Sequence, residues 1–283
     1  MNKAKQMLHY LDPRHYQLAV QCSLLGWGIG VLGFPVTASQ IIAVLLSALL
    51  TQAACCRILG LPMVWLSTFN TSLSLLLLLH AQGVGWLMLA AVVGIASKFT
   101  VRLGGRHVFN PSNIGIVAAL LLTDAVWAAP GQWGHGLWLF LLLAGGGLIF
   151  WVGWRTMLTS ISFLVAYASL LFAKALWLGD PFAIPLHQLQ NGSLLLFCFF
   201  MLSDPKTTPA HPFSRILFGV MVALLAVWLQ WHWFIPNAFL YALACLSPSV
   251  YLLNYYWNSP AFEWSKPLSK LAKTPATPSE TNP

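Results

Sequence analysis

Charged residues are scarce in this chain of 283 residues: only 7% are Asp, Glu, Lys or Arg, and only six are acids. Soluble domains carry roughly 25% charged residues, so a water-exposed surface cannot be covered here in the usual way. Hydrophobic residues make up 58% of the chain. The shortage of charge argues against an ordinary soluble protein and favours a surface that faces lipid.

The motifs of soluble enzymes are also missing. The sequence has no paired carboxylates, no Ser/His/Asp set, no Walker loop and no GxGxxG. Its five cysteines show no CxxC spacing, which argues against a disulfide framework or a zinc site. We therefore predict no catalytic residue and no metal site.

Long apolar segments predict an all-α integral membrane protein with about ten transmembrane helices. Most segments are long enough to cross a hydrocarbon core of roughly 30 Å, whereas the third and eighth are short. Residues 1–15 precede the first span, and residues 258–283 are polar, rich in proline and predicted to be disordered. The predicted spans are 16–33, 37–54, 64–80, 83–97, 111–127, 136–153, 157–178, 189–203, 215–233 and 237–257.

Basic residues predict the orientation of these spans. With the N-terminus inside, thirteen of the fourteen Lys and Arg residues fall on the cytoplasmic side, which predicts cytoplasmic termini in a bacterial inner membrane. Lys174 is the exception, and it is expected to reach toward water or to pair with Asp180. A cleaved signal peptide is the alternative interpretation of the N-terminus, but no small-x-small cleavage site follows the first span. An outer aromatic belt is predicted from Trp127, Trp133, Trp138, Trp177, Trp231 and Trp233.

A weak internal repeat predicts that the chain consists of two five-helix halves, residues 16–127 and 128–257. The motif HVFNP at residues 107–111 recurs as HWFIP at residues 232–236, an offset of 125 residues. Each copy precedes the fifth helix of its half. Because five is an odd number, the second half is expected to be inverted relative to the first, unless the similarity arose by chance.

Polar residues gather in and beside the two short spans. Asn70 lies in the third span, and His187 and Asn191 lie at the start of the eighth. Short or interrupted helices at matching places expose backbone groups that can bind a ligand near the middle of the membrane. We therefore predict a midplane site that contains these three side chains.

Two cytoplasmic segments suggest a further site. Residues 104–115 place Arg106, Asn110 and Asn113 at the start of a helix, where free N–H groups favour an anion or a polar ring. Asp204 follows the short eighth span. The alternative is that Asn110 simply caps the helix, that Arg106 contacts lipid headgroups, and that Asp204 belongs to an exposed turn neutralised by a neighbouring lysine.

Three motifs carry a resemblance to a known family: GRHVFNPSNIG, PLHQLQNGSLLLF and FMLSDPKTTP. They resemble the RnfD membrane component of Rnf electron-transport complexes and the related NqrB component of the sodium-pumping NADH:quinone oxidoreductase. A shorter stand-alone branch found near enediyne biosynthesis genes is similar in length and in its NPSN and AIPLHQL motifs. The resemblance implies an inverted-repeat bundle in a flavin-carrying redox chain that is coupled to ion movement and assembled with other membrane or periplasmic redox subunits. Any role in an oxidoreductase complex is then expected to be that of a non-catalytic membrane subunit.

The resemblance also bears on the cofactor. In Rnf and sodium-pump members, an outer threonine in a stretch resembling S-x-A-T-P-L carries FMN through a phosphoester. Ile184 stands at that position here and has no hydroxyl, so covalent FMN is not expected. The remaining expectation is FMN or riboflavin held noncovalently at Arg106, Asn110, Asn113 and Asp204. The alternative is a channel or transporter that uses the same bundle for a small molecule or ion, without redox chemistry.

Overall fold

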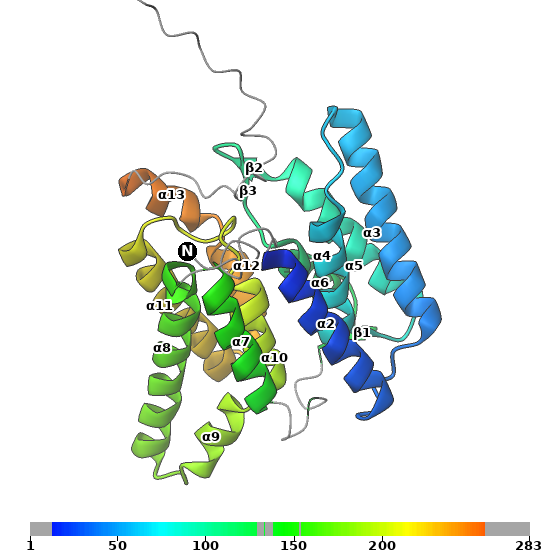
Figure 1. Ribbon diagram of the computed structural model, residues 1–283. Helices are drawn as coiled ribbons and strands as arrows, with labels where there is room; N and C mark the ends of the chain where they lie inside the picture. The colour runs from blue at the N-terminus through cyan, green and yellow to red at the C-terminus, as the bar shows by residue number, and fades with distance from the viewer. Residues whose placement is uncertain (1–12, 129–132, 134–137, 153, 258–283) are drawn as a thin grey trace, which may run out of the picture.

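The structure is a computed structural model that describes residues 13–128, 133, 138–152 and 154–257 (Figure 1). The predicted disordered tail and most of the predicted N-terminal segment lie outside these residues. Within them the chain is mostly helical, as expected.

Five helices form the first part of the chain. α3 begins at a capping box: the Thr37 hydroxyl accepts from the backbone N of Gln40, and the side-chain Oε1 of Gln40 accepts from Thr37 N. The helix ends at Gly60, which has a left-handed backbone conformation. The helices are α2 (Pro13–Gly30), α3 (Ala38–Leu59), α4 (Trp65–Leu78), α5 (Val84–Thr100) and α6 (Pro111–Leu122).

Two antiparallel pairs of two-residue strands connect these helices, so the described chain is not strictly all-α. β1 (His80–Ala81) pairs with β4 (Val126–Trp127). β2 (Arg102–Leu103) pairs with β3 (Arg106–His107) around Gly104 and Gly105, which both have positive φ. A Gly-Gly turn of this kind matches the twist of a hairpin.

The second part of the chain is also helical, with two interruptions. The predicted eighth span is a short α-helix followed by a π-helix, and the predicted tenth span bends by 51° near Pro248, which lacks the N–H that a continuous helix needs. The elements are α7 (Trp138–Val152), α8 (Trp154–Leu178), α9 (Ala183–Leu189), α10 (Gly192–Leu196), the π-helix η2 (Phe197–Met201), α11 (Pro212–His232), α12 (Ala238–Leu246) and α13 (Ser249–Tyr256).

Several described helices have the character of membrane spans. Among the described residues, three helical segments are long and apolar enough to cross a bilayer: α3, residues 157–178 of α8, and α11. The bent pair α12 and α13 makes a fourth. Shorter apolar helices are α4, α5, α6 and the combined α10 and η2.

The two short segments lie at the centre of the bundle. Every residue from 70 to 80, in and after α4, and from 192 to 203, in and after α10 and η2, is buried. Around them, α3 packs on α5 and α5 on α6, while α8 packs on α11 and α11 on α12 (Figure 1). The two parts of the chain meet where α2 contacts α7 and where α6 contacts α12.

One expectation about outer residues is wrong. Trp133 is only 1% exposed and meets the Phe34 ring edge-on at 5.0 Å, so it belongs to the core and not to a lipid-facing belt. Lys174, expected to reach toward water or to pair with Asp180, makes a cation–π contact that was not predicted: its Nζ lies 4.5 Å from the centroid of the Trp231 ring.

Candidate functional site

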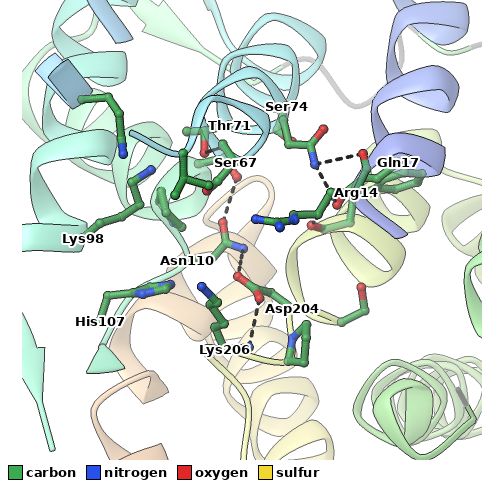
Figure 2. Close-up of a pocket in the computed structure, with 18 of the residues that line it drawn as sticks. Arg14, Gln17, Ser67, Thr71, Ser74, Lys98, His107, Asn110, Asp204 and Lys206 are labelled. Atoms are coloured by element: carbon green, nitrogen blue, oxygen red, sulfur yellow. Dashed lines mark hydrogen bonds between the residues drawn. The ribbon is translucent and has the colours of Figure 1, made fainter. Parts of the chain in front are cut away.

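A polar cavity of about 240 Å³ opens at the end of the bundle where most of the described basic residues lie. It is bounded by the starts of α2, α4 and α6, the end of α5 and the loop after η2 (Figure 2). We call it the basic-end pocket. Its polar lining residues are Arg14, Gln17, Gln52, Ser67, Asn70, Thr71, Ser74, Lys98, Arg102, His107, Asn110, Ser112, Ser203, Asp204 and Lys206.

Asn110 is buried at the wall of this pocket and makes hydrogen bonds through both the oxygen and the nitrogen of its side-chain amide. Its Oδ1 accepts from Asn113 N at 3.2 Å, which caps α6, and from Ser112 Oγ at 2.8 Å. Its Nδ2 donates to the Met201 carbonyl at 3.3 Å and to Asp204 Oδ2 at 3.5 Å. The capping role that we considered for Asn110 is therefore present, and the same side chain also links α6 to the loop after η2.

Asp204 is held in place by its own loop. Its Oδ1 accepts from Lys206 N at 3.0 Å, and its carbonyl oxygen accepts from Thr208 Oγ1 at 2.9 Å. The second carboxylate oxygen faces Asn110. The two segments that were predicted to be cytoplasmic therefore meet in one pocket (Figure 2).

Asn70 enters the same pocket from α4. Its Nδ2 donates to Gln17 Oε1 at 3.2 Å and to the Arg14 carbonyl at 3.5 Å. Its Oδ1 is buried without a hydrogen-bond partner among the described residues, and Gln52 Oε1 is likewise buried without a partner there. A buried acceptor without a partner is costly, so these two oxygens suit a ligand that donates hydrogen bonds.

Arg106 and Asn113, two of the four residues expected to bind a cofactor, do not line the basic-end pocket. Asn113 is buried, and its Nδ2 donates to the Leu240 carbonyl at 3.1 Å, which ties α6 to α12. Arg106 lines a neighbouring cavity of about 200 Å³ with Tyr251 and Asn254. Burial lowers the pKa of Arg106, and nearby Asp204 opposes that shift.

His107 stands between the two cavities and lines both. Burial lowers the pKa of His107, while the negative charge of Asp204 acts in the opposite direction. The imidazole is therefore neutral at pH 7, and one ring nitrogen is able to accept a hydrogen bond.

The structure does not bring the three expected midplane residues together. Asn70 lies in the basic-end pocket, whereas α9 and the start of α10 lie toward the opposite end of the bundle (Figure 1). His187 is exposed on α9, and Asn191 caps α10 by accepting from Ser193 N at 2.9 Å. Ile184 is also on α9, 47% exposed.

Sequence reasoning missed several residues that line the pocket. Gln17 is a polar residue in the first half of α2, and its Nε2 donates to the Phe200 carbonyl at 3.3 Å. Gln21, one turn later, donates to Ser74 Oγ at 2.7 Å. This i, i+4 pair of glutamines was a usable signal, because amides inside a membrane helix face the bundle interior.

Comparison with known proteins places the chain in a family. The sequence model of the NQR2, RnfD, RnfE family matches residues 121–263. The D-type component of the ion-translocating oxidoreductase complex of Escherichia coli O1:K1 is 31% identical over 141 residues, and that of the K12 strain is 32% identical over the same length. In each case the match covers 48% of this chain but only 36% of the relative. On the family match, this chain is a member of the NQR2, RnfD, RnfE family of integral membrane proteins.

Proposed function

We propose that the chain is a membrane subunit of an electron-transport complex linked to ion movement, and that it holds a flavin noncovalently in the basic-end pocket. The observation that carries this proposal is the convergence of Asn70, Asn110 and Asp204 in one cavity, beside two buried acceptors that have no partner within the described part of the chain. Its partners are expected to be other membrane or periplasmic redox subunits, since its relatives are named as subunits of ion-translocating oxidoreductase complexes.

The polar groups of the pocket match those of a flavin. Members of the family bind FMN. An isoalloxazine ring has an N3–H donor and two carbonyl acceptors, and the ribityl chain adds hydroxyl donors. Asn70 Oδ1 and Gln52 Oε1 can accept from these donors, while Asn110 Nδ2 can turn from its long 3.5 Å contact with Asp204 toward a ring carbonyl. When bound, a flavin would supply one- and two-electron transfer; the protein binds, orients and shields it.

A covalent flavin does not fit this chain. A phosphoester needs a side-chain hydroxyl, and Ile184 offers only a hydrocarbon surface on α9. The site for covalent FMN would also lie toward the opposite end of the bundle from the basic-end pocket (Figure 1). The proposed noncovalent site therefore does not depend on a hydroxyl at position 184.

We further propose ten membrane spans in two inverted halves, with the basic end in the cytoplasm. The support is the common packing order: the second helix of each half packs on the fourth, and the fourth on the fifth. In a cysteine-free background, cysteine at exposed Asp124 should react with an impermeant maleimide added to intact cells, whereas cysteine at exposed Arg57 should not. The reverse labelling pattern would contradict the orientation.

A transporter without redox chemistry is the second candidate. The observation that favours it is the burial of residues 70–80 and 192–203 at the centre of the bundle, with a polar contact, Gln21 to Ser74, between α2 and α4. On this hypothesis His187 and Asn191 would belong to a second polar site on the translocation path. A protein that binds no flavin but supports solute or ion flux in proteoliposomes would favour this candidate.

A riboflavin titration tests the flavin proposal. Purified apoprotein should quench riboflavin fluorescence with saturation, and Asp204→Asn should weaken binding by about tenfold, because removing the charge loosens the loop that positions Asn110. Asp124→Asn makes the same chemical change at an exposed position outside the pocket and should bind like the wild type. If neither the wild type nor the control quenches riboflavin, the proposal is wrong.

A further inference from the structure

The neighbouring cavity, of about 200 Å³, lies between the β2–β3 hairpin and the bend that joins α12 to α13 (Figure 1). We call it the hairpin cavity. A Cβ on Gly104 would lie 3.1 Å from Cε2 of Tyr251, so the hairpin turn and the first turn of α13 are in close contact. The hairpin cavity shares His107 and Lys206 with the basic-end pocket, but Arg106 lines the hairpin cavity alone.

Arg106 supplies an unused hydrogen-bond donor at this cavity. Its Nη2 is buried and has no hydrogen-bond partner within the described part of the chain. Arg215 differs, because its Nε donates to the Pro209 carbonyl at 2.7 Å. A guanidinium stays charged and carries five N–H donors, so burying one of its nitrogens without an acceptor is costly. An acceptor that enters the cavity beside Arg106 would remove that cost.

The charge of the cavity wall favours an anion. No acid is found among the described residues that line it, whereas the cations Arg106 and Lys206 do line it. Asp204 faces the basic-end pocket instead, where its two carboxylate oxygens accept from Lys206 N and from the Asn110 amide. A cavity that is walled by cations attracts anionic ligands.

Neutral donors add to Arg106. The side-chain oxygen of Asn254 accepts from Ala210 N at 2.8 Å, which leaves the amide nitrogen of Asn254 to donate elsewhere. The hydroxyls of Tyr251 and Tyr255, which also line the cavity, are further donors. Together these groups suit a ligand that has several acceptor oxygens.

The surroundings favour a phospholipid over a soluble anion. Apolar Leu103 and Val250 share the wall with Arg106. Tyr251 and Tyr255 are 48% and 75% exposed on α13, which follows the 51° bend in the predicted tenth span. Tyrosine rings at the end of a membrane span suit the headgroup region, because one end of the ring is apolar and the other is polar. A headgroup phosphate and the carbon atoms next to it match a wall of this mixed kind.

We propose that the hairpin cavity binds the headgroup phosphate of an anionic phospholipid such as phosphatidylglycerol. The guanidinium of Arg106 donates to the phosphate, and Asn254 and Tyr255 donate to its remaining oxygens or to the glycerol. Arginine binds phosphate through charge-assisted hydrogen bonds, and basic cavities between membrane helices suit anionic headgroups. A zwitterionic headgroup fits less well, because no acid of the described wall offsets its ammonium group. This site does not depend on the proposed flavin site.

Thermal unfolding of the purified, delipidated chain in detergent tests the proposal. Saturating dioctanoyl phosphatidylglycerol should raise the midpoint by about 5 °C, because a ligand that binds only the folded state stabilises it, and dioctanoyl phosphatidylcholine should raise it much less. Arg106→Gln should weaken the apparent affinity for phosphatidylglycerol by at least about tenfold. Arg57→Gln removes the same charge from the exposed last turn of α3, outside the cavity, and should keep the wild-type affinity.

Two neighbouring tyrosines on α13 give a second pair of variants, which keep Arg106. Tyr255 lines the cavity and Tyr256 does not, although they are equally exposed, at 75% and 76%. Because both rings are exposed, neither substitution by alanine should prevent folding. Tyr255→Ala should weaken the effect of phosphatidylglycerol, and Tyr256→Ala should leave it unchanged.

Three outcomes would overturn the proposal. The first is equal stabilisation by the two lipids. The second is an unchanged affinity in Tyr255→Ala together with either an unchanged affinity in Arg106→Gln or an equal loss in Arg57→Gln, since the charge of the whole surface would then be the cause. The third concerns the source of the phosphate: if glycerol 3-phosphate or inorganic phosphate stabilises the wild type as strongly as the lipid does at the same concentration, a soluble anion occupies the site. If Arg106→Gln does not fold, the tyrosine pair decides.

Discussion

The amide of Asn110 faces the carboxylate of Asp204, with 3.5 Å between Nδ2 and Oδ2. This contact joins the first turn of α6 to the loop that follows η2, two segments that lie 94 residues apart in the chain. Because the same amide caps α6, the position of the cap and the position of the carboxylate are coupled. Both residues line the pocket that we assign to the flavin.

Two substitutions of Asn110 separate its two roles. Asn110→Ser keeps an oxygen that can cap α6 but removes the donor to Met201 and Asp204, so it should fold normally and bind flavin weakly. Asn110→Ala removes both functions and should lower stability by about 1 kcal/mol more. Thermal unfolding in detergent and flavin titration measure the two effects. Equal stability of the two variants would show that the cap is energetically unimportant.

The close approach of α5 and α6 positions the start of α6. A Cβ on Gly94 would lie 2.4 Å from the Pro111 carbonyl oxygen, and a Cβ on Gly115 would lie 2.4 Å from the Ala90 carbonyl oxygen. Gly94→Ala should therefore cost about 1–3 kcal/mol and displace the first turn of α6, with loss of flavin binding. Gly85→Ala on the same helix meets nothing within 4 Å and is the matched control. Unchanged unfolding of the Gly94 variant would refute this packing.

The lowered pKa of His107 predicts how the free energy of unfolding depends on pH. Burial lowers its pKa in the folded protein, so below the unfolded value of about 6.5 the unfolded chain binds more protons than the folded one. The stability that the neutral ring contributes is present above that pH and is lost as pH falls through the folded pKa. His107→Gln should flatten the acid side of the thermal-midpoint profile. His187→Gln, at an exposed position on α9, is the control and should leave that profile as in the wild type.

The identity of residue 184 predicts how flavin is attached. Wild-type protein that is co-expressed with a flavin transferase should give a dark band under ultraviolet light on a denaturing gel, because Ile184 has no hydroxyl. Ile184→Thr restores the hydroxyl on an exposed turn of α9 and should give partial labelling, since Pro181 stands where the S-x-A-T-P-L stretch has serine. A fluorescent wild-type band would mean that another hydroxyl carries the flavin.

Apolar length and turn residues predicted ten helical segments but not the short helix α9. All ten predicted spans coincide with described helical segments, and the shortness of the third and eighth spans was visible in the sequence. The bend at Pro248 was not predicted, because the length of an apolar segment does not show whether its helix is straight or bent. Trp133 was assigned to the aromatic belt because a tryptophan ring suits both the membrane interface and a protein core. Its place in the core depends on its packing against Gly192 and Phe34, which the sequence does not show.

The site was partly accessible from the sequence. Asn110 and Asp204 were identified because polar residues beside Pro in an apolar chain are conspicuous. Arg106 was assigned to the same site, yet the turn of the β2–β3 hairpin directs it into the neighbouring cavity. Lys98 and Gln17 were missed because their membership of the pocket depends on how α2 and α5 pack, which no local pattern encodes.

The visible absorption spectrum of the purified wild-type chain tests the central claim most directly. We expect the visible absorption spectrum of a flavin, and we expect denaturation to release all of the chromophore, since it is held by Asn70, Asn110 and Asp204 without a covalent bond. A colourless protein that also fails to take up FMN or riboflavin would contradict the account.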